Sequence, residues 1–149
     1  IPRLADWNRH AIAGGLPWLQ VLPFDGRFAA IGPLFVPGET CCYECYRLRR
    51  SANVFCEPEY AALDGTPARY PLSPALLAAL AGLGTHLAFT WIVQGDPQAV
   101  GIMFAFEWTR GPTVTGHHVY RVPRCPACSA ALDSPPAVWF DAERSEVGV

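Results

Sequence analysis

Ile31-Gly-Pro-Leu-Phe-Val-Pro-Gly-Glu-Thr-Cys-Cys-Tyr-Glu-Cys45 decides the fold, because an apolar run passes through a Pro-Gly turn directly into a cysteine pair. A second pair with the same two-residue gap lies in Pro123-Arg-Cys-Pro-Ala-Cys128. This gap lets both thiolates of a pair approach one ion from a tight turn, and two pairs complete the tetrahedral set that zinc prefers. We therefore predict one structural Zn²⁺ ion bound by Cys42, Cys45, Cys125 and Cys128.

The two pairs are far apart in the sequence, with residues 46–124 between them. Two unrelated pairs, a single redox pair or an iron centre are the alternatives to a shared zinc site. Cys41 is one residue too far from Cys45 to replace Cys42, and Cys56 has no partner at motif spacing. We expect both to be small buried hydrophobic residues.

Hydrophobic runs and turn signals on either side of the first pair predict an α/β chain with a mixed sheet containing antiparallel hairpins. The turn between the first two strands is Phe24-Asp25-Gly26, and the last strand leads to the second cysteine pair. A long loop is expected over 55–74. We predict a domain over 1–132 and a tail or linker over 133–149. The expected helices are Asp6–Ala13, Tyr46–Asn53 and Ala75–Val93, and the expected strands are Pro17–Pro23, Arg27–Val36, Ala99–Thr109 and Thr113–Val122.

The helix predicted over Ala75–Val93 follows a Ser73-Pro74 start signal and is apolar on nearly all sides. A helix without a polar face belongs in a core or at a subunit interface, so a homodimer is one expected arrangement. Glycines and His86 interrupt the apolar run, and the N-terminus has no signal-peptide pattern, so we predict a soluble cytoplasmic protein without a membrane span. The chain begins at Ile1 and its single methionine is Met103, which suggests a piece of a longer product.

Composition and motifs argue against several functions. The formal net charge is −2, which is not the basic balance of a nucleic-acid-binding protein. No glycine-rich phosphate loop is present, and the carboxylates show no spacing typical of acid–base catalysis. We expect His86 to be a hydrogen-bonded core residue and His117 and His118 to lie at the surface. Catalysis is therefore not predicted.

Three arginines follow the first cysteine pair on the second predicted helix. A rigid metal site would hold them in place, so they could meet an acidic surface of a partner enzyme; a solvated basic face is the alternative. The candidate partner-binding residues are Arg47, Arg49 and Arg50.

The segment from Gly32-Pro33 to Cys45, the long apolar helix and the hairpin ending at Cys128 resemble the C-terminal half of the ubiquitin-activating-like (ThiF/MoeB) superfamily. Together with Asn8 and Pro17-Trp18, they look most like ThiF-like proteins of azole-forming peptide (bacteriocin) biosynthesis, the leader-peptide-binding partners of YcaO cyclodehydratases. In that family the two cysteine pairs hold a structural zinc. The family's nucleotide-binding glycines precede the matched part, so adenylation cannot be transferred to this chain.

The resemblance implies a catalytically silent scaffold that delivers a precursor peptide to a YcaO enzyme making thiazoles or oxazoles. The alternative is a fragment of an ATP-dependent ThiF/MoeB-type adenylating enzyme. A zinc-ribbon interaction module without a peptide-modifying role is a third interpretation.

Overall fold

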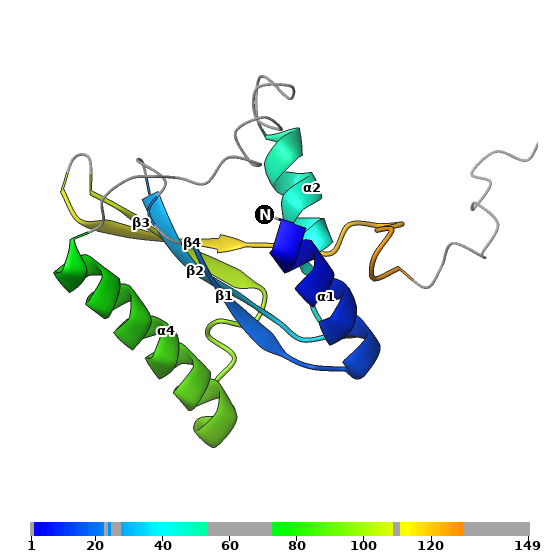
Figure 1. Cartoon of the computed structure of the whole chain (residues 1–149), viewed down its shortest axis with the longest axis horizontal. Coiled ribbons are helices and arrows are strands. Elements are labelled where there is room, and N and C mark those ends of the chain that lie inside the picture. The colour runs from blue at the N-terminus through cyan, green and yellow to red at the C-terminus, as the bar shows by residue number, and fades with distance from the viewer. Residues whose placement is uncertain (1, 23, 25–27, 54–72, 109–110, 130–149) are drawn as a thin grey trace, which may run out of the picture.

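The computed structural model describes residues 2–22, 24, 28–53, 73–108 and 111–129. The predicted tail over 133–149, Cys56 and most of the predicted loop over 55–74 lie outside these residues. Three helices and four strands make up the described part (Figure 1). In chain order they are α1 (Pro2–Gly14), β1 (Trp18–Leu22), β2 (Phe28–Phe35), α2 (Tyr43–Ala52), α4 (Pro74–Gln94), β3 (Ile102–Glu107) and β4 (Thr113–His118).

The four strands form one sheet in the order β1-β2-β3-β4, and every neighbouring pair is antiparallel. One isolated parallel bridge joins Leu34, near the end of β2, to Val100, which lies just before β3. The α/β fold class, the long apolar helix and the four-cysteine site predicted from the sequence are confirmed. All four predicted strands are present: β1 and β3 are largely half-buried, β2 is buried along nearly its whole length, and β4 is exposed at all six residues.

The two faces of the sheet have different coverings. Leu80 of α4 packs with Ala29 and Ile31 of β2, and Leu19 and Phe106 border this cluster. The other face carries Trp18, Leu22 and Met103, which pack against the cysteine-rich core around α1 and α2. Alternation of side chains along a strand explains this division. Figure 1 shows α4 on one side of the sheet and α1 with α2 on the other.

Only one side of α4 is buried in the described chain, so the prediction of a core or interface position is met by the core on that side alone. Leu80, Gly84 and Thr90 are buried, and a Cβ at Gly84 would lie 3.3 Å from Cγ2 of Val21, so the glycine allows close packing on β1. The opposite side exposes Ile92 and Val93 by 72% and 62%. By length and composition alone α4 meets the criteria for a membrane span, a test that the core helix of a soluble protein also meets. The sequence prediction of no membrane span rested instead on the glycines and His86 that interrupt its apolar run.

Several predicted boundaries are shifted for local reasons. α1 begins at Pro2 rather than Asp6, and α2 begins at Tyr43, so the first cysteine pair forms the start of this helix. β3 is shorter than predicted because Gly101, with φ of 67°, turns the chain just before Ile102. β4 ends at His118, so the second cysteine pair lies in a turn beyond the strand rather than at its end.

Candidate metal centre

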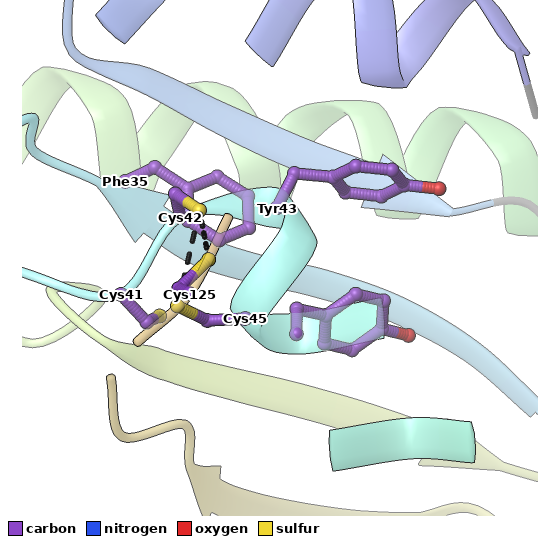
Figure 2. Packing of buried hydrophobic residues seen from close by; sticks show 7 residues of the cluster. Phe35, Cys41, Cys42, Tyr43, Cys45 and Cys125 are labelled. Atoms are coloured by element: carbon purple, nitrogen blue, oxygen red, sulfur yellow. Dashed lines mark hydrogen bonds between the residues drawn. The ribbon is translucent and has the colours of Figure 1, made fainter. Parts of the chain in front are cut away.

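Four cysteine sulfurs converge at the N-terminus of α2, all within 4.8 Å of one another. The Sγ of Cys42 lies 3.8 Å from that of Cys45 and 3.7 Å from that of Cys125 (Figure 2). The sulfurs of Cys45 and Cys128 are 3.5 Å apart. These separations far exceed a disulfide bond of about 2.05 Å. A tetrahedral ion with metal–sulfur bonds of about 2.3 Å requires sulfur–sulfur distances of about 3.8 Å. The four thiols are therefore spaced to bind one metal ion.

The first pair is positioned by a turn and by α1. The Val36 N–H donates to Oγ1 of Thr40 at 2.8 Å, which fixes the turn before Cys41. Cys42 is the N-cap of α2 and provides no side-chain cap. Instead, the Tyr43 N–H donates to Oδ1 of the buried Asn8 at 3.0 Å. A residue of α1 thus satisfies one of the free N–H groups that every helix N-terminus carries.

The second pair is held by arginine side chains that bind backbone carbonyl oxygens. Arg121 donates to the carbonyl oxygens of Gly38 at 3.0 Å and Cys128 at 3.1 Å, so it links the turns that carry the two cysteine pairs. Arg49 of α2 donates to the carbonyl oxygens of Tyr120 at 2.6 Å and Arg121 at 2.9 Å. We call Arg49 and Arg121 the arginine clamp. It joins α2, the Gly38 turn and the segment that follows β4.

A backbone N–H also contacts the cluster directly. The Val122 N–H donates to the Sγ of Cys45 at 3.3 Å. Hydrogen bonds of this kind stabilise the thiolate form that a metal ion requires. The segment between β4 and the second pair therefore contributes to the site before its own cysteines are reached.

The pKa values of Cys42, Cys45 and Cys128 are shifted in different directions. A hydrogen bond from Cys42, together with the Val122 N–H, lowers the pKa of Cys45 to about 4. The same bond to Cys45, and burial, raise the pKa of Cys42 above its usual range, and burial raises the pKa of Cys128 to about 11. Metal binding must displace the protons of the neutral thiols, so metal affinity falls as the pH is lowered.

The remaining predicted candidates have varied outcomes. Cys41 is 3% exposed and lies outside the four-sulfur cluster, as expected for a small buried hydrophobic residue. His117 and His118 are exposed as predicted. His86 is also exposed, so its interpretation as a core histidine is wrong. His86 lies on α4 outside the side of the helix, carrying Leu80 and Gly84, that packs on the described sheet.

The three candidate partner-binding arginines differ in their surroundings. Arg47 donates from Nε and Nη2 to the Glu44 carboxylate at 3.1 Å each, at the surface of α2. Arg49 belongs to the arginine clamp, and its guanidinium lies 5.9 Å from the centre of the Tyr120 ring. Arg50 is half-buried near the end of α2. Contact of these residues with a partner stays a prediction. Sequence reasoning missed Asn8 as a cap and Arg121 as a link, because neither has a motif of its own.

Comparison with known proteins identifies the fold. No family model matches this sequence, and no curated protein matches it. Among solved structures, a heterocyclase in complex with substrate and cofactor superposes with a TM-score of 0.73 and 24% identity, over 85% of this chain and 18% of that chain. The heterocyclase TruD gives a TM-score of 0.62 and 32% identity, over 85% of this chain and 20% of that chain.

A second group of similar structures comprises the microcin C7 biosynthetic enzyme MccB. MccB in complex with N-formylated MccA gives a TM-score of 0.62 and 22% identity, over 85% of this chain and 38% of that chain. The chain has the ThiF-like fold of these proteins. The resemblance stated from the sequence is thereby confirmed for a part of such a protein, since the chain spans about a fifth of the two heterocyclases.

Proposed function

We propose that this chain is a non-catalytic scaffold component of a thiazole- and oxazole-forming cyclodehydratase complex in the biosynthesis of ribosomal peptide natural products. It delivers a precursor peptide to a YcaO-type enzyme in the cytoplasm. The observation that carries the proposal is the likeness of 85% of the chain to two heterocyclases. The described residues add a buried cysteine cluster as their main chemical feature, which favours a structural over a catalytic role.

We propose zinc as the ion at the cysteine cluster. Four thiolates fill all positions of a tetrahedral ion and leave none for water or substrate, as in structural zinc sites. Cys45 and Cys125 are fully buried, which also limits access of a substrate to the ion. Such an ion would contribute folding free energy by holding together two turns that are distant in sequence. Elemental analysis of protein purified without chelator distinguishes zinc from iron.

A fragment of an ATP-dependent adenylating enzyme is the second candidate function. One of the similar structures is MccB of E. coli with ATP, which shares the fold at 21% identity. The present sequence lacks a glycine-rich phosphate loop, so we expect no ATP binding by this chain. Calorimetry with ATP and magnesium separates the two functions, because micromolar binding would favour the adenylating enzyme.

Reconstitution tests the scaffold role. The chain, as part of its full-length protein, is mixed with a YcaO-type cyclodehydratase, ATP and a cysteine-containing precursor peptide. Each thiazoline ring forms when the cysteine thiol attacks the preceding amide carbonyl and the peptide loses one water, and mass spectrometry detects this loss. Ring formation should depend on the full-length protein. A rate that is equal without it would contradict the proposal.

The arginines of α2 are the proposed contact with the partner enzyme. Because Arg49 also supports the cysteine cluster, charge reversal at Arg50 is the cleaner test. Arg50→Glu should weaken the apparent affinity of the cyclodehydratase while zinc content stays the same. Arg3→Glu, which reverses an exposed charge on α1, is the matched control. Equal affinities of both variants and the parent would remove Arg50 from the interface.

A further inference from the structure

The outer edge of β4 is open within the described part of the chain. β4 is the last strand in the sheet order, and all six of its residues are exposed. The strand contains no proline and no Asp, Glu, Lys or Arg, and its register with β3 is free of bulges. Proteins usually protect open edges with charges, prolines, bulges or covering segments, because such edges pair readily with other chains. This edge has none of the first three protections.

The register shows which backbone groups lie on that edge. The Val119 N–H donates to the Gly101 carbonyl oxygen at 2.8 Å, which places the N–H of Val119 on the side of β3. Backbone groups alternate along an antiparallel strand, so the N–H groups of residues 113, 115 and 117 also point to β3. The outward groups belong to Val114, Gly116 and His118. These three residues present their N–H and C=O groups to a fifth strand.

Gly116 provides a place for a side chain of that strand. It is paired with Phe104 of β3, and a Cβ at Gly116 would lie 3.7 Å from Cγ2 of Ile102 and 3.8 Å from the Phe104 ring. The glycine therefore leaves the half-buried Phe104 uncovered at the edge. A side chain opposite Gly116 on an added strand could cover this ring, as cross-strand neighbours do in antiparallel sheets. An apolar or aromatic residue fits best there.

We propose that an extended segment of the precursor peptide pairs with β4 as a fifth strand, with an apolar side chain over Gly116. This inference rests on the proposed function, because it names where this chain contacts the peptide. An open edge is recognised by an extended main chain, and alternate side chains then provide specificity. A second copy of the chain fits less well. Six residues give an edge of about 20 Å, which is too short to bury the roughly 800 Å² per partner of a stable dimer.

Amide hydrogen exchange, read residue by residue by NMR, tests the proposal on the zinc-loaded chain. The probe is a short synthetic peptide of alternating threonine and valine with a central phenylalanine and terminal lysines. We expect the exchange of Val114, Gly116 and His118 to slow by at least about tenfold when the peptide is added, because their N–H groups become bonded. Thr115 and His117 should change little, since their N–H groups already face β3.

Two controls address the main-chain bonds. Gly116→Pro removes one outward N–H and should abolish protection, whereas Gly116→Ala retains the N–H and should preserve it, since its Cβ makes only ordinary contacts. The same peptide N-methylated at alternate residues should not bind the unmodified protein, which keeps the test valid if Gly116→Pro does not fold.

Three results would overturn the proposal: exchange unaffected by the peptide, outward amides already protected in dilute peptide-free protein, or protection that rises with protein concentration alone. The last two would indicate an edge covered by the chain itself or by a second copy. None of these results depends on the cyclodehydratase. If the peptide protects the β4 edge but ring formation in the reconstitution does not depend on this protein, the proposed function would be contradicted instead.

Discussion

Replacing Arg121 by alanine should weaken metal binding without removing a metal ligand. Arg121 donates to the carbonyl oxygens of Gly38 and Cys128, so it joins the turns of the two cysteine pairs. Hydrogen bonds from a charged donor are worth about 1.5–3 kcal/mol each. Because Arg121 is exposed, we take about 2 kcal/mol for both bonds together. If zinc binding and folding of this region are coupled, the loss corresponds to a roughly 30-fold higher Kd for zinc.

Chelator competition measures this Kd, with the thermal transition as a second readout. Arg124→Ala is the matched control, because Arg124 is an exposed arginine next to Cys125 with no carbonyl contact within the described residues. Arg121→Lys retains the charge but cannot reproduce the two-point geometry, and it should give an intermediate Kd. A Kd of Arg121→Ala within about threefold of the parent, or an equal loss in Arg124→Ala, would refute the role of Arg121 as a link.

Four further predictions concern the metal site, the close packing at Gly32 and the exposed surface of α4. Cys125→Ser should abolish stoichiometric zinc and lower the melting temperature, and unchanged values of both would contradict a shared site. Gly32→Ala should destabilise the chain by several kcal/mol in denaturant unfolding, because Gly32 has φ of 89° and a Cβ would lie 2.3 Å from the Ile102 carbonyl oxygen. Gly82→Ala, with open space around it, should instead be stabilising by about 0.5–1 kcal/mol. The double variant Ile92→Gln, Val93→Gln should reduce self-association in sedimentation, since Ile92 and Val93 are exposed, while a lower melting temperature would show that they are buried in the free chain.

The features that could be predicted from the sequence are those with a local cause. Two-residue cysteine gaps, the Pro-Gly turn and strand-like runs between turn residues each act within a few residues, so they identified the four sulfurs and the four strands. The start of α2 was misplaced by one turn, because a metal-binding turn and a helical first turn have similar local sequence. Here Cys42 is the N-cap and Cys45 is already within the helix.

The contacts that stabilise the site have no local cause and were missed for that reason. Asn8 caps a helix 35 residues away in sequence, and Arg121 binds a carbonyl 83 residues before it. Nothing in the neighbourhood of either residue indicates its partner. The same limitation affected Arg49. From the sequence alone, an arginine that binds the segment after β4 could not be distinguished from an arginine that is free at the surface.

The environment of α4 could be predicted only in part. Its apolar composition indicates that much of its surface is buried, but it does not indicate which element or partner buries that surface. An apolar helix without a polar face predicts burial on every side. In the described chain, the side of Leu80 and Gly84 packs on β1 and β2, while Phe89 and Ile92 on the rest of the helix remain exposed by 54% and 72%. An exposed apolar surface of this kind marks an interaction site more often than a free surface. The prediction of a core or interface position therefore concerns two surfaces of α4: the side that packs on the sheet and the exposed apolar side. The sheet covers the first surface. Measuring the oligomeric state in solution decides whether a second copy of the chain covers the other.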